Sequence, residues 1–168
     1  QAALHVADLP TGGSGLMLEG RCIVPGVQAV TFAGQNPRTF VSKRWSEGYP
    51  GAFSPAHRLR DMDLEGIDVA MVFPSLAGAL GGVRDGRLAA NMARGYNRWL
   101  LDYCRTDPLP LLAAAIVPLQ DPPAAVAEVE WAAQQGFRCV MVRASRYQGR
   151  AHDHPDFAAF YAACAHHG

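Results

Sequence analysis

Short apolar runs that follow helix-like or turn-like segments recur along this 168-residue chain and limit the folds open to it. The preceding segments end at Gly66, at Pro108–Pro110 and at Gly136. The runs are residues 67–73, 111–117 and 137–142. Such runs, rich in branched and aliphatic side chains, are typical of parallel strands covered on both faces. The alternation therefore predicts an α/β fold with right-handed crossovers.

Amphipathic helices are expected around these runs. Ser54-Pro55 and Asp121-Pro122 each combine a capping side chain with proline at the first helical position. The predicted helices cover residues 55–65, 87–105, 122–135 and the segment that begins at Pro155. In the second helix, helical spacing predicts one buried stripe made of Leu88, Met92, Tyr96, Trp99, Leu100 and Tyr103. In the last helix the same reasoning selects Phe157, Phe160, Tyr161 and Cys164.

The N-terminal part of the chain differs from the rest in composition and in hydrophobic periodicity. Residues 1–53 are rich in glycine and proline and carry no long helical period. Apolar residues on both sides of Glu19-Gly20 predict a small hairpin, Gly12–Gly15 is interpreted as a turn, and no strand is expected at the very front. We therefore expect an irregular excursion with one hairpin over 1–53 and an α/β domain over 54–168.

Both ends of the chain predict an interior piece of a longer α/β protein. Gln1 is not an initiator methionine, and Gly168 ends a helix as Gly66 and Gly136 do, but no strand follows it. About three parallel strands cannot close a barrel and leave two unpaired edges. The piece alone is therefore expected to be inactive, free of metal and prone to aggregation.

Composition excludes several classes of partner. Fifteen basic and fifteen acidic residues cancel, so nucleic acid and anionic membranes are not expected partners. No apolar run is long enough to span a membrane. The four cysteines are far apart in the sequence and predict reduced, mostly buried thiols in a cytoplasmic protein, in preference to a disulfide or zinc site. The remaining expected partners are a small-molecule substrate and, for the parent protein, further copies of itself.

Two architectures fit the alternation of strands and helices, a (β/α)8 barrel and a doubly wound sheet. The loop after Phe73 contains Gly78, Gly81 and Gly82, but not in the order of a dinucleotide-binding fingerprint. No Lys-Ser or Lys-Thr follows it, as a phosphate loop would need. The pattern favours the barrel and leaves the doubly wound sheet as an alternative.

Ligands bind at the carboxyl ends of the strands in either architecture. Three polar residues follow the predicted strands there and are the candidate substrate-binding residues: Ser75, Gln120 and Arg143. A guanidinium at a strand end can hold a carboxylate through two parallel hydrogen bonds. The alternatives are that Arg143 pairs with a neighbouring acidic side chain and that Ser75 and Gln120 cap loops.

The histidines do not predict a metal centre. His152-Asp153-His154 has the spacing of two metal ligands, but the pair precedes Pro155 and so lies in a turn, not on a strand. The sequence holds neither a nucleophile elbow nor the zinc-protease helix motif. We therefore expect neither metal ligands nor a catalytic residue in this chain.

Several phrases resemble the amidohydrolase-related branch of the amidohydrolase superfamily, which includes aminocarboxymuconate-semialdehyde decarboxylase and related decarboxylases and hydrolases. They are GAFSPAHRLRDMDLEGIDVAMVFPS, ARGYNRWLLDYCRTDPLPLLAAAIVPLQDPPAAVAEVEWAAQQGFRCVMVR and HPDFAAFYAACAHHG. The phrase GLMLEGRCIVPG also looks like the excursion that follows the first strand in many members. Together these phrases cover nearly the whole chain in the family's order.

The resemblance implies a metal-dependent (β/α)8 barrel, of which this chain would supply strands two to four. In the family a divalent metal, for which we expect zinc, is held by histidines on strands that would lie before Gln1 and after Gly168. The implied parent enzyme is a hydrolase or decarboxylase of a carboxylate-bearing or aromatic small molecule. Two other functions stay open: a noncatalytic binding or assembly module, and a doubly wound nucleotide-binding protein.

Overall fold

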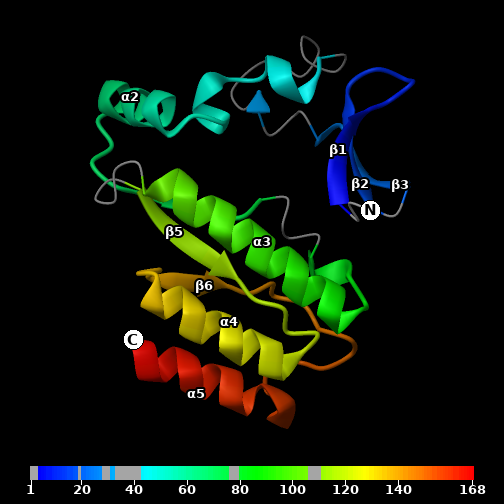
Figure 1. Cartoon of the computed structure of the whole chain (residues 1–168), viewed down its shortest axis with the longest axis vertical. Coiled ribbons are helices and arrows are strands. Elements are labelled where there is room, and N and C mark those ends of the chain that lie inside the picture. Colours follow the sequence, from blue (N-terminus) through cyan, green and yellow to red (C-terminus); the bar gives the residue numbers. More distant parts are fainter. Residues whose placement is uncertain (1–3, 19, 28–30, 33–42, 76–79, 106–110) are drawn as a thin grey trace. The chain divides into compact units, whose positions relative to one another are not determined.

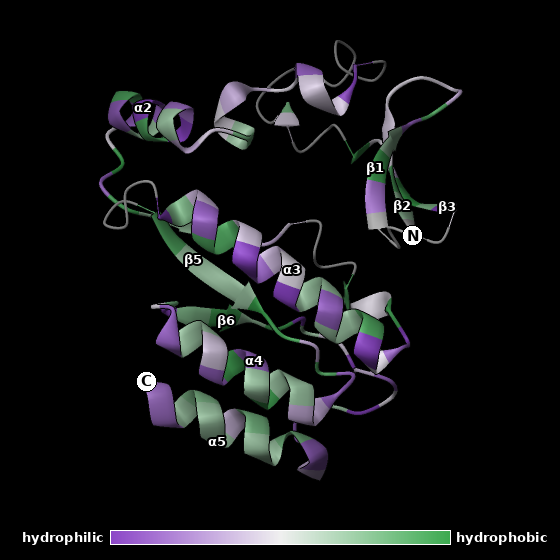
Figure 2. Cartoon of the chain, viewed as in Figure 1, coloured by the Kyte–Doolittle hydropathy of each residue, from purple (hydrophilic) through white to green (hydrophobic). Residues whose placement is uncertain are grey.

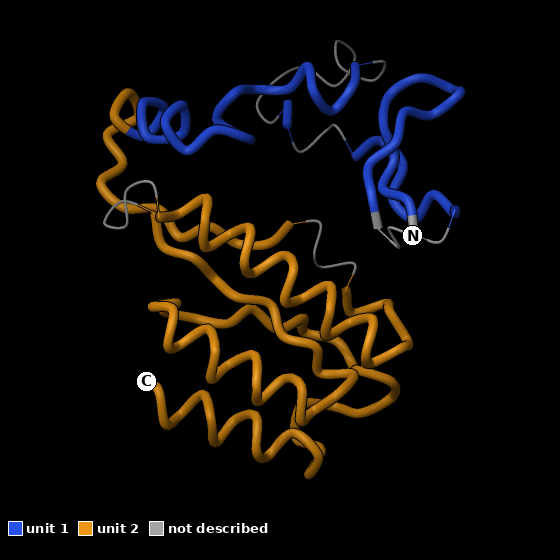
Figure 3. Tube along the Cα trace, in the orientation of Figure 1, with its two compact units in different colours: residues 1–62 blue, residues 63–168 orange. Residues whose placement is uncertain are grey.

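The computed structural model describes residues 4–18, 20–27, 31–32, 43–75, 80–105 and 111–168. The chain divides into two compact units, residues 1–62 and residues 63–168, shown in two colours in Figure 3. The predicted boundary after residue 53 falls inside the first unit, shortly before the helix α2 (Pro55–Glu65). The two units are described separately below.

The first unit begins with an antiparallel sheet in the order β1-β2-β3. Its strands are β1 (Leu4–Asp8), β2 (Ser14–Leu18) and β3 (Arg21–Pro25). The hairpin of β2 and β3 was predicted, but the expectation that no strand lies at the front is wrong, because β1 pairs with β2 along its whole length. Gly12 and Gly13, with φ of 90° and 76°, reverse the chain between β1 and β2. Glycine adopts this left-handed conformation without steric cost.

Among the described residues of this unit, two short 3-10 helices precede α2: η2 (Trp45–Glu47) and η3 (Pro50–Ala52). The backbone N–H of Trp45 donates to Ser14 Oγ at 3.0 Å, and the Trp45 ring meets Phe53 edge-on at 5.8 Å. The N–H of Tyr49 donates to the carbonyl of Thr31 at 2.8 Å. These bonds attach the turn-rich segment to β2 and to residue 31. The start of α2 at Pro55 agrees with the predicted cap.

The second unit contains the predicted parallel sheet, in the order β4-β5-β6. The strands are β4 (Ala70–Val72), β5 (Leu111–Ile116) and β6 (Cys139–Met141), and the helices are α3 (Gly86–Cys104), α4 (Pro122–Gln134) and α5 (Ala158–His167), the last preceded by η5 (Pro155–Phe157) (Figure 1). This is the predicted alternation of helices and parallel strands. The outer strands are shorter than their apolar runs, because each pairs with only half of β5. Ile67, Val69 and Phe73 lie outside β4 and are exposed.

The register of the sheet places two strand ends side by side. β5 pairs with β4 through residues 111–113 and with β6 through residues 114–116. Ile116, the last residue of β5, lies opposite Met141, the last residue of β6. The chain segments that follow these two strands therefore start from the same edge of the sheet.

The main hydrophobic cluster lies between α4, the loop after β5 and the last helical segment. Its buried members are Val117, Leu119, Ala125, Val129, Tyr147, Phe157, Phe160 and Ala163. Figure 2 shows that hydrophobic residues run along β5 and much of α5. The predicted stripe of the last helix is correct for Phe157 and Phe160, but Tyr161 is 40% exposed and Ala163 takes its place in the core.

The predicted buried stripe of α3 is correct for Leu100 and Tyr103, but the rest of the buried face is displaced around the helix. The buried residues are Ala89, Ala93, Asn97, Leu100, Tyr103 and Cys104, whereas Trp99 is 50% exposed. Leu88, Met92 and Tyr96 are half-buried at the margin of the contact. Small side chains at positions 89 and 93 let the helix backbone approach the sheet closely, so that the larger neighbours flank the interface.

A buried polar network joins α3, β5 and α4. The Asn97 amide accepts a bond from the N–H of Ile116 (2.9 Å) and donates to the carbonyl of the same residue (2.9 Å). It also donates to Glu128 Oε1 (2.8 Å), and Glu128 Oε2 accepts from Arg94 Nε (2.6 Å). The Arg94 guanidinium lies 4.9 Å from the ring centre of Trp131. The Asn97 side chain thus supplies the hydrogen bonds that a neighbouring strand would give to Ile116.

All four cysteines are free thiols. Cys104 is buried, Cys139 and Cys164 are half-buried, and Cys22 is exposed, so the expectation of mostly buried thiols holds for all but Cys22. Burial raises the pKa of Cys104, Cys139 and Cys164 above the ordinary value of a thiol. The reactive thiolate of these three is therefore rarer at neutral pH than that of an ordinary cysteine.

We expect one fast-reacting cysteine at pH 7.5 when the native protein is treated with a thiol-specific disulfide reagent. Cys22 should react at least about tenfold faster than the other thiols, since the thiolate is the nucleophile and burial limits both its formation and its access. Raising the pH should increase the reaction rates of Cys104, Cys139 and Cys164, because their raised pKa values mean that more of their thiolate forms only in alkaline solution. The variant C22S should lose the fast phase alone, and survival of that phase in C22S would contradict the assignment.

Among the residues that the structure describes, no helix is both long enough and apolar enough to cross a membrane.

Candidate functional site

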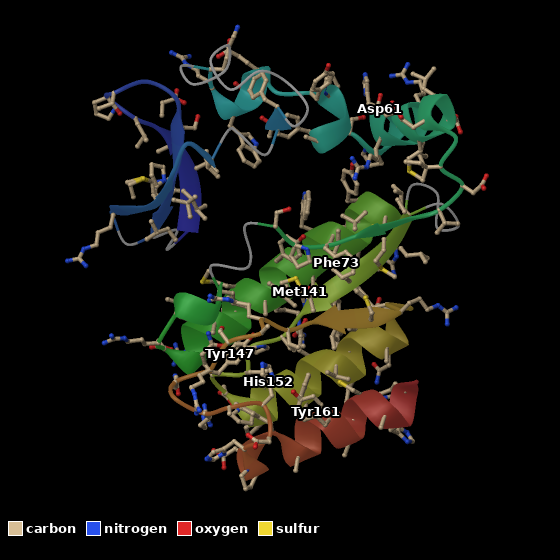
Figure 4. All side chains as sticks on the ribbon, turned by 180° about the vertical axis from the view of Figure 1, so that it is seen from behind. Asp61, Phe73, Met141, Tyr147, His152 and Tyr161 are labelled. Carbon is tan, nitrogen blue, oxygen red and sulfur yellow. The ribbon has the colours of Figure 1, made fainter. Side chains whose placement is uncertain are left out.

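A shallow hollow, open to solvent, lies at the carboxyl ends of β5 and β6. Its lining residues come from three segments of the second unit: Leu80, Gly81, Ile116, Val117, Met141, Arg143 and Tyr147. Figure 4 shows Met141 and Tyr147 beside the end of the sheet. Among the described lining residues, Leu80, Ile116, Val117 and Met141 are apolar and Arg143 is the charged one. Because it is shallow and open, the hollow can contact a small molecule but does not enclose one.

Arg143 lies where the sequence predicts it, two residues beyond the end of β6. Its side chain is exposed and passes over Gly81, and within the described part of the chain its guanidinium has no ion-pair partner. The alternative that it pairs with an acidic neighbour at the rim therefore finds no support in these residues. An uncompensated positive charge next to aliphatic walls can attract an anion.

The backbone of Arg143 is fixed by two side chains. Its N–H donates to Tyr147 Oη at 3.0 Å, and its carbonyl accepts from His152 Nε2 at 2.7 Å. The Tyr147 ring also meets the rings of His152 and Phe157 edge-on, at 5.9 and 6.4 Å. These contacts tie the loop after β6 to the main hydrophobic cluster. The position of the Arg143 Cα atom is consequently set by the core of the unit.

His152 connects this loop to α5. Its Nδ1 lies 2.8 Å from Tyr161 Oη, and Figure 4 shows Tyr147, His152 and Tyr161 one after another between the loop and the helix. When the ring is neutral, a donating Nε2 leaves Nδ1 as an acceptor, so the hydroxyl proton of Tyr161 lies in a hydrogen bond to Nδ1. Burial raises the pKa of Tyr161, which keeps this proton in place. His152 therefore serves the loop structure in this conformation.

His154 has a different role from His152. Its Nδ1 accepts a bond from the backbone N–H of Asp156 at 3.2 Å and caps η5. The two imidazoles thus point to different partners and do not converge. Across the described ranges, no group of three or more histidine, cysteine, aspartate or glutamate side chains could hold a metal ion. These residues do not fit a metal centre.

Gln120 is buried beside the hollow and ties two segments together. Its Nε2 donates to the carbonyl of Leu80 at 2.6 Å and to that of Val83 at 3.0 Å. Its Oε1 is also buried and, in the part of the chain that the structure describes, has no hydrogen-bond partner. The amide therefore performs the loop-capping role that the sequence left open, and one acceptor atom stays available.

Ser75 is exposed just after Pro74, beyond the end of β4. The residues that follow it, 76–79, lie outside the described residues, as does the loop position Gly78. A substrate contact by Ser75 stays a prediction.

Sequence reasoning missed the roles of three residues of this site: Gly81, Tyr147 and His152, the last of which was considered only as a metal ligand. Gly81 was considered only as part of a phosphate loop, although a glycine opposite a strand end is also a place where a long side chain can lie against the backbone. The contacts of Tyr147 and His152 span four and nine residues around Arg143, a separation that no helical or strand period marks.

Comparison with known proteins places these observations in a family. The amidohydrolase family profile matches residues 4–168, whereas no curated protein matches the chain. Among solved structures, 2,6-dihydroxybenzoate decarboxylase from Rhizobium is 29% identical and has a TM-score of 0.60 over 66% of this chain and 36% of that one. The 5-carboxyvanillate decarboxylase from Novosphingobium aromaticivorans is also 29% identical, with a TM-score of 0.60 over 66% of this chain and 31% of that one.

A further structure matches over nearly the whole chain. An amidohydrolase from Mycobacterium avium subsp. paratuberculosis is 20% identical and has a TM-score of 0.73. The match covers 98% of this chain and 49% of that protein, which shows a shared fold. The chain spans about one third to one half of the length of these proteins. Because the family profile extends over both units of the structure, the chain belongs to the amidohydrolase family.

Proposed function

We propose that this chain is part of a metal-dependent hydrolase or decarboxylase that acts on a small aromatic or other carboxylate-bearing molecule. The observation that carries the proposal is the guanidinium of Arg143 beside the aliphatic hollow, without an ion-pair partner among the described residues. Family membership and the likeness to two decarboxylases of aromatic acids support it. In the proposed whole protein, β4, β5 and β6 belong to a (β/α)8 barrel, and residues 1–53 are an excursion from it.

The proposed metal ligands lie outside the described residues, whose side chains do not fit a metal centre. Two similar structures, the 5-carboxyvanillate decarboxylase and a dihydroxybenzoic acid decarboxylase from Polaromonas, contain manganese. Manganese is therefore the first ion to test, with zinc as the ion that the sequence resemblance implies. The contribution of this chain is the substrate-facing side of the site.

Arg143 is proposed to hold the substrate's anionic group while Ile116, Val117 and Met141 contact its apolar body. A guanidinium binds a carboxylate through two parallel N–H···O bonds, which fix orientation as well as position. In a decarboxylation the bond between the ring carbon and the carboxylate breaks, carbon dioxide leaves, and the ring carbon gains a proton. In a hydrolysis, water is added across the cleaved bond. Both reactions need the anion to be held in a fixed direction.

The variant R143A in the full-length protein tests this function. With 2,6-dihydroxybenzoate and 5-carboxyvanillate as probe substrates and manganese present, we expect KM to rise about ten- to a hundredfold, since a hydrogen bond to a charged group contributes that much to binding. R143K should recover part of the loss, because it keeps the charge but not the fork geometry.

The matched control is R146A. Arg146 is exposed three residues further along and donates only to the carbonyl of Gly149 among the described residues. The KM of the R146A variant should stay within about twofold of the wild-type value, because substitutions of exposed surface residues usually have small effects. Equal KM values for R143A and R146A would refute the proposed role of Arg143.

A noncatalytic binding module is the second candidate, and it rests on the same hollow and the same unpaired Arg143 guanidinium among the described residues. It predicts binding of the same aromatic acids by calorimetry with no turnover at any manganese or zinc concentration. Membership of the amidohydrolase family argues against the doubly wound nucleotide-binding alternative.

A further inference from the structure

We infer that Gly81 and Gln120 are positioning residues that set the direction of the Arg143 guanidinium. The inference rests on the proposed function for its effect on substrate, and on contacts of the described residues for its geometry. The argument concerns one short segment, Leu80–Val83, which we call the arginine bed.

The arginine bed contacts the Arg143 side chain at Gly81. A Cβ atom added at Gly81 would lie 2.6 Å from Arg143 Cδ and 3.1 Å from Cζ, and closer still to Nη1. Real carbon contacts essentially never come so near, so any side chain at position 81 must displace the arginine. The obstructed atoms belong to the outer part of a flexible side chain, which can swing away. The cost of a methyl group at this position therefore falls on the direction of the guanidinium more than on the fold.

Neighbouring Gly82 provides an internal comparison. A Cβ atom added there meets nothing within 4 Å. The requirement for glycine is thus specific to the position beneath Arg143. It is not a general property of the Gly-Gly pair.

The arginine bed is held from two directions. The Gln120 amide, in the segment after β5, donates to the carbonyls of Leu80 and Val83. Gln148, in the loop after β6, donates through Nε2 to the carbonyl of Arg84 at 2.7 Å. Gln148 is also the one non-glycine residue with positive φ (51°) in the described part of the chain. The loops after both strands therefore fix the segment on which the arginine lies.

The backbone of Arg143 is fixed independently, by Tyr147 and His152. With both the Cα atom and the surface under the side chain held, fewer directions are open to the guanidinium than to a free arginine side chain. Prearrangement lowers the entropy that a ligand must remove on binding, and so increases affinity without any new contact. Gly81 and Gln120 thus act on the substrate through Arg143.

The test compares G81A with G82A in the full-length protein, with 2,6-dihydroxybenzoate as the probe substrate. For G81A we expect KM to rise about tenfold with kcat within about twofold, and for G82A no change in either. In the R143A background, G81A should add nothing further, because the residue through which it acts is gone. Thermal melting of each variant checks that the fold persists, and Q120E, which turns a carboxyl group toward two carbonyl oxygens, provides a second route to the same KM effect.

A readout without substrate separates this inference from the proposed function. Modification of Arg143 by p-hydroxyphenylglyoxal, followed by peptide mass spectrometry, should change in rate at least about threefold in G81A and not in G82A. A changed rate with an unchanged KM would support the positioning by Gly81 and refute the proposed function of Arg143. An unchanged rate in G81A, or an equal KM effect of G81A with and without Arg143, would overturn the inference.

Discussion

Replacing Asn97 by alanine is expected to lower the free energy of unfolding by about 3–5 kcal/mol, since each buried polar group left without a partner costs about 1–3 kcal/mol. Asn97 is fully buried and satisfies both backbone groups of Ile116 and one oxygen of Glu128. All three lose their partner in the variant, and a small cavity forms at the interface of α3, β5 and α4. Chemical denaturation followed by circular dichroism measures the difference.

N91A is the matched control for this prediction. Asn91 lies on the same helix but is exposed, so the identical substitution should change the stability by no more than about 0.5 kcal/mol. Should both variants prove equally stable, the buried network would not contribute to folding as described. A milder loss is expected for E128Q, whose amide oxygen can still accept from Asn97, while its NH2 group takes the place of the oxygen that accepts from Arg94, so that this ion pair and its hydrogen bond are lost.

Phe157→Ala is the second substitution with a large expected effect, a loss of about 3–5 kcal/mol in the free energy of unfolding, typical of a fully buried phenylalanine. The Phe157 ring is fully buried and lies edge-on to Tyr147 at 6.4 Å, with the Arg150 guanidinium 5.1 Å from its centre. Its removal opens a cavity in the main hydrophobic cluster and loosens the support of Tyr147. Thermal and urea denaturation of the variant give the measurement.

The same substitution at Phe73 serves as the control. Phe73 is 55% exposed after β4, so F73A should cost no more than about 1 kcal/mol. A loss in F157A as small as that in F73A would show that the cluster relaxes to fill the space. It would also mean that the loop after β6 depends little on Phe157.

The order of elements from α2 onward was predictable because each one carries a local signal. Pro55 and Pro122 open helices, Gly66 and Gly136 follow them in the left-handed conformation, and β5 lies within the predicted run. These signals depend on backbone preferences that neighbouring residues alone determine. Strand lengths were less predictable, since they depend on pairing: β4 and β6 extend only as far as their register with β5 allows.

Burial on α3 was predicted from the helical spacing of large apolar residues, which was correct for Leu100 and Tyr103. The prediction failed where close approach of the helix matters more than the size of the side chain. Ala89 and Ala93 lie under the sheet because they are small, and Asn97 is buried because β5 needs its hydrogen bonds. β1 was missed for a related reason. Its residues pair with β2 only after the chain reverses at Gly12 and Gly13, and nothing in the five residues alone marks a strand.

At the site, the expectation that ligands bind at the carboxyl ends of parallel strands selected Arg143 and Gln120 but not the residues around them. This expectation depends on topology, which the alternation of elements reveals. The contact of Gly81 with Arg143 joins residues far apart in the sequence and depends on the path of a side chain. Such contacts form only in the assembled structure, so no local sequence pattern predicts them.

The stepped pairing of β5 has a consequence for how the sheet opens. β4 uses the first half of β5 and β6 uses the second half, so the outer strands share no pairing residues. Detachment of β4 would leave the ladder between β5 and β6 intact, and with it the junction of Ile116 and Met141 that borders the hollow. Local unfolding can thus begin at one margin without spreading to the other, and the hydrogen-exchange protection of the two outer strands is free to differ.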